Sequence, residues 1–221
     1  MFLSDHLVAT GALGYVRGIS GGLGSTLAGR LAQLAVEGRR EVDAETVFVT
    51  MRLPCKMQLD EDDARATLDY VGPDEIVACN VAEAVDVFEA EYFNATRLPL
   101  SDSTKGNTEA RLRMVTQYAF AGERGLLVIG TDHGAESVTG CLTKSGDGAA
   151  DVVPRFGLDE QRNRELPRHL GGPERPWGKG PTADLLDGIP GRPDEVELGL
   201  TSTQIDALTI PVTPLHTWWR R

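Results

Sequence analysis

The sequence predicts an α/β protein in which one parallel β-sheet lies between two layers of helices. Four short apolar runs alternate along the chain with stretches of helical periodicity. The fourth run contains Leu-Leu-Val-Ile at residues 126–129, which is typical of a strand buried on both faces. Alternating strands and helices favour a parallel sheet covered on both faces. We expect the four strands at residues 15–19, 46–53, 75–81 and 125–130.

Two segments between these strands have the spacing of an amphipathic helix. Leucines recur at positions 23, 27, 31 and 34, between the first and second strands. Between the third and fourth strands, Leu112, Val115 and Ala119 share one helical face. Asn107 is placed to cap the N-terminus of that helix. We therefore expect one helix after the first strand, and another that begins at Asn107.

The chain is long enough for one domain, which we assign to residues 1–221. Seven of the twelve prolines lie between residues 154 and 193, among glycines and charged residues. A disordered tail is one interpretation of this composition. We favour loop-rich structure after about residue 151 that folds over the carboxyl ends of the strands, where ligands of such sheets bind.

Charge and composition argue against several classes of protein. The formal net charge of −11 and the pI near 4.8 would repel a nucleic-acid backbone over most of the surface. The chain has no apolar run of the roughly eighteen residues that would span a membrane, and its N-terminus has no signal-peptide pattern. The three scattered cysteines show no zinc-site spacing. We expect a cytoplasmic protein with free thiols.

A glycine-rich turn, Ser20-Gly21-Gly22-Leu23-Gly24-Ser25, joins the first expected strand to the following helix. Glycines let the backbone approach a phosphate group closely, and the N–H groups of the helix N-terminus point toward it. The two serines add hydroxyl donors. The turn has neither the GxGxxG spacing nor the GK[ST] ending of other phosphate loops. Taken alone, it is as compatible with a simple tight turn as with phosphate binding.

Further short segments follow this turn in a fixed order. They are residues 52–54 (RLP), 106–111 (GNTEAR), 130–136 (GTDHGAE), 143–148 (TKSGDG), 181–185 (PTADL) and 193–199 (PDEVELG). Together with the turn, they resemble the SGGxDS, RLP, GNxxAR, GTDHxxE, TKxGDG, PTADL and PDExxLG segments of ammonia-dependent NAD⁺ synthetases, which are N-type ATP pyrophosphatases. The resemblance extends from about Gly18 to Gly199. It implies an adenine nucleotide alpha hydrolase-like (Rossmann-like) three-layer α/β/α fold.

The resemblance also implies an activity. Such enzymes adenylate the nicotinate carboxylate of deamido-NAD⁺ with ATP, releasing pyrophosphate, and ammonia then displaces AMP to leave the amide. This chemistry depends mostly on positioning and electrostatics, so no residue is assigned as catalytic. Glu136 would be a ligand of the Mg²⁺ cofactor, while Arg111, Lys144 and Asp151 would bind deamido-NAD⁺. The residues implied to bind ATP are Gly18, Ile19, Ser20, Gly21, Gly22, Leu23, Gly24, Ser25, Arg52, Gln58, Thr131 and Thr182.

The resemblance further implies a homodimer, formed partly by an N-terminal arm. Only seventeen residues precede Gly18, which puts that dimer in doubt.

Several departures from the family pattern fall at functional positions. Gly24 replaces the aspartate of SGGxDS, normally a magnesium ligand, so magnesium should bind less tightly. Arg17 occupies a strand position that should be apolar, where an unpaired charge would be costly. Glu160-Gln161 replaces a Lys-Arg pair whose lysine contacts ATP, and Pro167 should interrupt the helix that follows. Ser202 replaces a tyrosine, and a His-Lys pair used on deamido-NAD⁺ has no counterpart.

Each site residue also has an ordinary structural interpretation. Arg111 could be a solvated helix residue, Glu136 a surface carboxylate, and Lys144 with Asp147 a weak loop ion pair. His133 next to Asp132 is more typical of a structural histidine than of a catalytic base.

Four hypotheses for the chain follow. The first is that the chain is an active NAD⁺ synthetase, and the second is that it is a nucleotide-binding relative that has lost turnover. The third is an ATP pyrophosphatase that acts on a tRNA base or a purine nucleotide. The fourth is an altered or incomplete version of a working enzyme.

Overall fold

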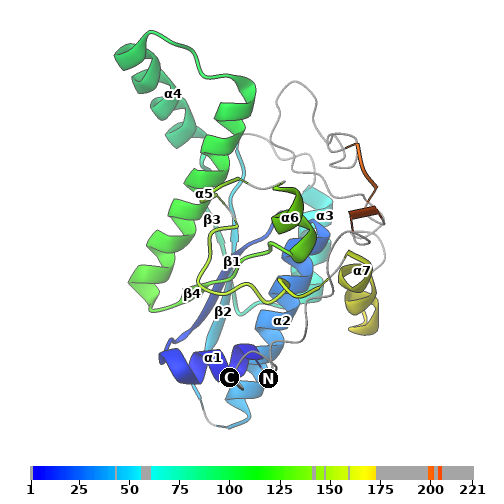
Figure 1. Cartoon of the computed structure of the whole chain (residues 1–221). Helices are drawn as coiled ribbons and strands as arrows, with labels where there is room; N and C mark the ends of the chain where they lie inside the picture. The colour runs from blue at the N-terminus through cyan, green and yellow to red at the C-terminus, as the bar shows by residue number, and fades with distance from the viewer. Residues whose placement is uncertain are drawn as a thin grey trace, which may run out of the picture.

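A computed structural model describes residues 2–42, 44–55, 61–140, 143–146, 148–158, 160–172, 199–201 and 204–205. Within them, four parallel strands form one sheet in the order β3-β2-β1-β4 (Figure 1). The strands are β1 (Gly14–Gly18), β2 (Val47–Arg52), β3 (Glu75–Ala78) and β4 (Leu127–Val128). The predicted parallel sheet is confirmed, and all four strands lie inside the predicted ranges to within one residue.

Helices cover both faces of the sheet, as Figure 1 shows. On one face, α2 (Leu23–Arg40) contacts β1 and β2, and α1 (Phe2–Thr10), α3 (Glu61–Val71) and α7 (Glu160–His169) pack against α2. On the other face, α5 (Asp102–Arg124) contacts β1 and β4, and α4 (Ala82–Thr96) packs on α5. The short helix α6 (Gly134–Thr139) follows β4. The α/β/α layering that the sequence predicts is therefore present.

Alternating residues of the central strand β1 contribute to two separate cores. Tyr15 belongs to the cluster beneath α1 and α2, and its hydroxyl donates to the carbonyl oxygen of Leu3 at 2.9 Å. Val16 belongs to the cluster beneath α5, which includes Ala121. Both β1 residues are fully buried. This period of two places the next residue, Arg17, on the face of Tyr15.

The strand order creates a switch in direction between β1 and β4. From β1 the chain proceeds to β2 and β3 on one side, and then crosses to β4 on the other side of β1. In open parallel sheets, ligands bind outside the carboxyl ends of the strands at this point. The predicted phosphate loop follows β1, and Thr131 follows β4, so both lie at the switch point.

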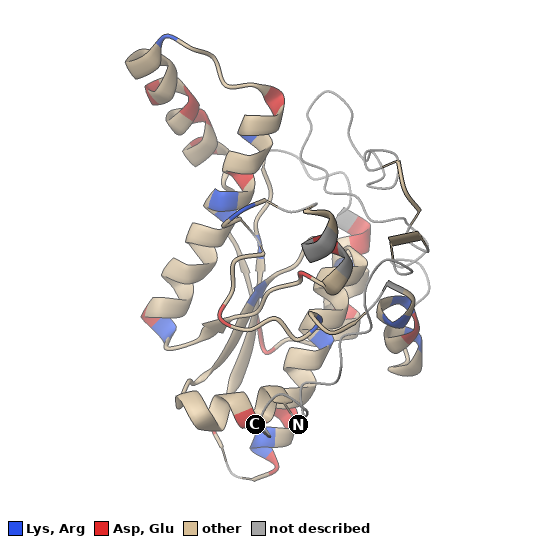
Figure 2. Ribbon diagram, in the orientation of Figure 1, with Lys and Arg blue, Asp and Glu red and all other residues tan. Residues whose placement is uncertain are grey.

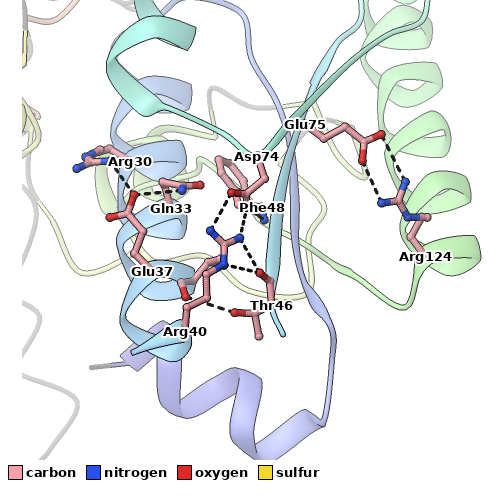
Figure 3. Close-up of polar contacts among 10 residues, drawn as sticks. Arg30, Gln33, Glu37, Arg40, Thr46, Phe48, Asp74, Glu75 and Arg124 are labelled. Atoms are coloured by element: carbon pink, nitrogen blue, oxygen red, sulfur yellow. Dashed lines mark hydrogen bonds and ion pairs between the residues drawn. The ribbon is translucent and has the colours of Figure 1, made fainter. Parts of the chain in front are cut away.

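At the opposite, amino edge of the sheet, a polar cluster joins α2 to β2 and to the segment before β3 (Figure 3). Arg40 donates to both carboxylate oxygens of Asp74 and to the carbonyl of Thr46, while Asp74 accepts the N–H of Phe48 at 2.8 Å. Burial raises the pKa of Asp74, but the hydrogen bonds from Arg40 and from the Phe48 N–H outweigh it. The pKa is therefore lowered overall.

Helix α5 differs from its prediction in both its start and its buried face. Its N-cap is Ser101, whose hydroxyl accepts the N–H of Thr104 at 3.3 Å, so the predicted cap at Asn107 is wrong. Asn107 lies one turn inside the helix. Val115 is exposed, and the buried positions are Gly106, Ala110, Gln117 and Ala121. The buried face of α5 includes small and polar residues, which a search for apolar residues at helical spacing does not detect.

Pro167 does not interrupt α7, so that prediction is also wrong. The helix includes it at the eighth of ten positions, and the Leu170 N–H still bonds to the Leu166 carbonyl at 3.0 Å. A proline in the last turn removes a single backbone donor, which a helix end tolerates better than its middle does. No helix in the part of the chain described is long and apolar enough to cross a membrane.

Candidate functional site

The glycine-rich turn is anchored on both sides by the sheet and its helices. The Gly18 N–H donates to Gln117 Oε1 of α5 at 2.7 Å, and the Ile19 N–H donates to the Met51 carbonyl of β2 at 2.8 Å. Gly21 has φ +89°, and a Cβ there would lie 3.0 Å from the Ala64 backbone nitrogen of α3. Gly21 therefore combines a positive φ with close helix packing, which only glycine accommodates without strain.

The turn presents the N-terminus of α2 together with two hydroxyl groups. Gly22 is the N-cap, with no side chain to accept from the first amides of the helix, and those amides have no intrahelical acceptor. Ser25 donates to the Gly22 carbonyl at 3.1 Å, and its oxygen lies 3.2 Å from that of the exposed Ser20. An eighteen-residue helix directs its positive end here, an arrangement suited to a phosphate group.

Two buried arginines hold the segment that follows β4 beside this turn. Arg17 donates to the Ile129 carbonyl at 3.0 Å and to Thr131 Oγ1 at 2.9 Å. Arg155 donates to the Thr131 carbonyl at 2.7 Å and to Asn163 Oδ1 of α7 at 3.0 Å. The arginines are 4% and 3% exposed. Arg17 is thus buried, as the strand pattern requires, and it is hydrogen-bonded.

Gly24, in the first turn of α2, contacts this arginine-linked segment. A Cβ at position 24 would overlap Arg155 Nη1 and would lie 3.5 Å from the Thr131 Cβ. The structure thus brings together Gly24, Thr131 and Arg155, which are far apart in the sequence. Of the predicted ATP-binding residues, the loop from Gly18 to Ser25 and Thr131 therefore form one continuous cluster.

Two residues predicted to bind deamido-NAD⁺, Arg111 and Lys144, also lie together. Arg111 Nε on α5 donates to the Lys144 carbonyl at 3.2 Å, and both side chains are exposed. One turn earlier on α5, Asn107 Oδ1 accepts the hydroxyl of Thr143 at 2.7 Å. Helix α5 therefore fixes the turn at residues 143–146, and Arg111 of α5 and Lys144 of the turn place two cationic side chains there.

Asp151, the third residue predicted for deamido-NAD⁺, makes contacts within the protein. Its carboxylate accepts the N–H of Val128 at 2.7 Å and the hydroxyl of Tyr118 at 3.4 Å. Burial and the neighbouring Asp151 carboxylate raise the pKa of Tyr118. Asp151 thereby ties the segment after residue 148 to β4 and α5. Its role toward a ligand stays a prediction.

Glu136, predicted to bind magnesium, lies in the first turn of α6 and pairs with His133. Its Oε2 accepts the His133 backbone N–H at 3.0 Å and lies 3.0 Å from His133 Nδ1. Among the described residues, no group of three or more His, Cys, Asp or Glu could hold a metal ion. These residues do not fit a metal held mainly by the protein, since Arg155 lies beside Gly24 and Glu136 is engaged with His133.

Other predicted positions are less informative. Arg52 ends β2 at the carboxyl edge and is partly buried. Gln58, Thr182, Asp147, Ser202 and the Glu160 side chain lie outside what the structure describes.

Sequence reasoning missed three residues of the site: Gln117, Asn107 as a loop anchor, and Arg155. Gln117 and Asn107 carried a usable signal, because a buried glutamine and a mid-helix asparagine both need hydrogen-bond partners. Arg155 carried none, since it lies between Pro154 and Gly157 in a segment without periodicity.

The fold and the site together define a class: an α/β nucleotide-binding protein with a glycine-rich turn at the switch point of a parallel sheet. The NAD synthase family model matches residues 1–213, so the chain belongs to the NAD synthase family. The chain is 54% identical over 205 residues to the NH(3)-dependent NAD(+) synthetase of Bacillus mycoides, covering 93% of this chain and 75% of that protein. The family predicted from the ordered segments is confirmed.

Two solved structures extend the comparison. The NAD+ synthetase of Burkholderia pseudomallei superposes with a TM-score of 0.81 at 46% identity, over 94% of this chain and 77% of that one. The NMN synthetase of Francisella tularensis superposes with a TM-score of 0.79 at 32% identity, over 94% and 81% of the two chains. Both likenesses extend over nearly the whole of this chain.

Proposed function

We propose that the protein is an ammonia-dependent NAD⁺ synthetase. ATP adenylates the nicotinate carboxylate of deamido-NAD⁺: a carboxylate oxygen bonds to the α-phosphorus, and the bond from that phosphorus to the pyrophosphate breaks. Ammonia then attacks the activated carbonyl carbon, AMP leaves, and a proton is lost to give the amide. The 54% identity to an NH(3)-dependent NAD(+) synthetase over 93% of the chain supports this choice of reaction.

The observation that carries the proposal is the cluster at the carboxyl edge. The N-terminus of α2, the hydroxyls of Ser20 and Ser25, and Thr131 lie at the switch point of the sheet. Backbone amides and hydroxyls fixed in this way suit a polyphosphate, because they need no rearrangement as charge moves to the leaving pyrophosphate. The cationic Arg111 and Lys144 supply a second anion-binding position for the dinucleotide.

Magnesium, a cytoplasmic location and a homodimer complete the proposal. Mg²⁺ typically binds phosphate oxygens and few protein carboxylates, which suits a site where Glu136 is the single candidate ligand from the sequence. Cys55 and Cys79 are free thiols, as in a reducing compartment. Val87, Phe88 and Phe93 of α4 are 64%, 46% and 45% exposed, and a second copy would cover some of these apolar side chains. Sedimentation of wild type and Val87→Glu tests the dimer.

The activity is tested with purified protein, ATP, Mg²⁺, an ammonium salt and deamido-NAD⁺. We expect NAD⁺, AMP and pyrophosphate in equal amounts, and no product when ammonium is omitted. Nicotinate mononucleotide serves as the competing acceptor, because a superposable relative is an NMN synthetase. A higher kcat/KM with the mononucleotide would redirect the proposal to that reaction. ATP binding without pyrophosphate release from either acceptor would contradict it.

A further inference from the structure

We propose that Gln117 of α5 is a positioning residue for ATP, because it holds the first backbone amide of the glycine-rich turn. The inference rests on the proposed function, since the ligand of that turn would be the polyphosphate of ATP. Gln117 lies outside all the segments that carry the family resemblance. It acts through the backbone of Gly18 and not by contact with a substrate.

The Gln117 side chain is buried and has a partner at each end of its amide. It is 2% exposed, its Oε1 accepts the Gly18 N–H at 2.7 Å, and its Nε2 donates to the Arg113 carbonyl at 3.4 Å. An N–H group only donates and a carbonyl only accepts, so these partners fix which end of the amide faces the turn. Burying an amide costs free energy, and an apolar residue would fill the same space without that cost. The glutamine therefore serves the Gly18 amide.

The contact leaves the start of the turn little freedom to move. A Cβ at Gly18 would lie 3.2 Å from Gln117 Oε1, so the side chain packs directly against the end of β1. The next amide, that of Ile19, donates to the Met51 carbonyl of β2 at 2.8 Å. Two successive amides are thus held by α5 and by β2, just before the turn reaches the N-terminus of α2. A phosphate site made of backbone amides depends on such fixed geometry.

Helix α5 holds two further segments, and it does so from other turns of the helix. Arg113 Nε donates at 3.0 Å to the Leu53 carbonyl, just after β2, and Asn107 Oδ1 accepts the Thr143 hydroxyl at 2.7 Å. Thr143 begins the turn predicted to bind deamido-NAD⁺. Roughly 15 Å of helix separates Asn107 from Gln117. A substitution at position 117 should therefore weaken ATP binding and leave the binding of deamido-NAD⁺ unchanged.

The first experiment is calorimetry of ATP with Mg²⁺ and, separately, of deamido-NAD⁺, on the full chain. We expect Gln117→Leu to weaken ATP binding by at least about tenfold, and deamido-NAD⁺ binding by less than about twofold. Gln33→Leu is the matched control, because Gln33 is also buried, at 3% exposed, but lies on α2 and bonds to Glu37. This control should lower stability and keep both affinities.

Gln117→Glu provides a second test, with a side chain of nearly the same shape. A protonated carboxyl group reproduces both hydrogen bonds of the amide, whereas the ionised form has no donor for the Arg113 carbonyl and brings negative charge to the turn. Burial raises the pKa of such a carboxyl group. Relative to wild type at the same pH, ATP affinity should be within about threefold at about pH 5.5, and should fall about tenfold further by about pH 8.5.

Gln117→Leu that binds ATP as the wild type does would overturn the proposal. Equal losses of affinity for the two ligands would do so as well, and so would a loss of ATP affinity that Gln33→Leu matches. If Gln117→Leu does not fold, Gln117→Glu decides, and a relative ATP affinity that is independent of pH overturns the proposal. The expected ATP affinities without NAD⁺ formation contradict only the proposed function. NAD⁺ formation with unchanged ATP affinities contradicts only the role of Gln117.

Discussion

At the amino edge of the sheet Arg40 pairs with the carboxylate of Asp74, whereas at the carboxyl edge Arg17 and Arg155 donate to the carbonyl oxygens of Ile129 and Thr131. The Arg40 side chain is 39% exposed, and the other two arginines are buried. Figure 3 shows the first arrangement, in which one guanidinium joins three segments. Both edges thus use arginine to tie backbone segments together, in different electrostatic surroundings.

The two sets of contacts support different parts of the molecule. Asp74 cancels the charge of Arg40, so that cluster stabilises the fold and has little left to offer an anion. Arg17 and Arg155 donate to carbonyl oxygens of the segment that follows β4, so they hold Thr131 beside the glycine-rich turn. Over the whole chain acidic residues outnumber basic ones by 33 to 22, and both signs occur on α5 and α7 (Figure 2). An anion site in this protein therefore depends on local, fixed groups.

The largest expected effect is at the amino edge, from Gly14→Ala. Gly14 has φ +149°, and a Cβ there would overlap the carbonyl group of Val47 in β2. Because both atoms belong to paired strands, neither can move without breaking the sheet. We expect a loss of at least about 3 kcal/mol in the free energy of unfolding, measured by urea denaturation.

Gly11→Ala is the control for Gly14→Ala. Gly11 also has a positive φ, +68°, but a Cβ there would meet nothing within 4 Å. Its cost should be about 1–2 kcal/mol, from backbone strain alone. Equal losses in the two variants would show that the contact with β2 contributes nothing.

The second prediction removes the acid of the amino-edge cluster. Asp74→Asn should cost about 1–2 kcal/mol at neutral pH, because Arg40 and the Phe48 N–H lose a charged acceptor that is partly open to solvent. Folding lowers the pKa of Asp74, so the ionised carboxylate stabilises the folded state. Its contribution to the free energy of unfolding is complete above the pKa of the unfolded chain, about 3.9, and is lost as the pH falls through the lower pKa of the folded state. Denaturation of both proteins from pH 7 to 3 should show the difference shrinking below about pH 4. A difference independent of pH would contradict this assignment.

The sequence predicted the sheet well because each strand carries its own signal. Apolar runs at β1, β2 and β4 mark buried strands, and the glycines after β1 mark the turn into α2. The family was predictable for a similar reason, since seven short segments occur in order. These are local properties of the chain, and they need no knowledge of which segments meet in space.

The site was less predictable where its contacts join distant segments. The loss of a carboxylate at Gly24 was visible in the sequence, but the guanidinium beside it comes from residue 155 and depends on the placement of α7. Arg17 was recognised as an anomaly in a buried strand, but its acceptors lie just after β4, over a hundred residues later. The error at Asn107 had the same origin, because its partner Thr143 determines its role.

The third prediction concerns the carboxyl edge and separates binding from stability. Arg111 is exposed, and its one described hydrogen bond is to the Lys144 carbonyl, so Arg111→Ala should leave the unfolding free energy within about 0.5 kcal/mol of wild type. If Arg111 binds deamido-NAD⁺, the KM for that substrate should rise about tenfold, which corresponds to about 1.4 kcal/mol. Steady-state kinetics measure the KM, and Arg39→Ala, in the last turn of α2 at the amino edge of the sheet, is the control. An unchanged KM would leave Arg111 with only its role in holding the turn.

The smallest expected effect is at the exposed ion pair between β3 and α5. Arg124 Nη2 lies 3.0 Å from Glu75 Oε2, and the two side chains are 43% and 40% exposed. In contrast to Asp74, Glu75 makes this contact in solvent, where screening and side-chain entropy offset most of the attraction. Glu75→Gln should therefore change the unfolding free energy by no more than about 0.5 kcal/mol, and added salt should remove the difference. If Glu75→Gln lowered the free energy of unfolding as much as Asp74→Asn does, exposure would not distinguish the two ion pairs. The stability of the amino-edge cluster would then not come from its hydrogen bonds to the backbone.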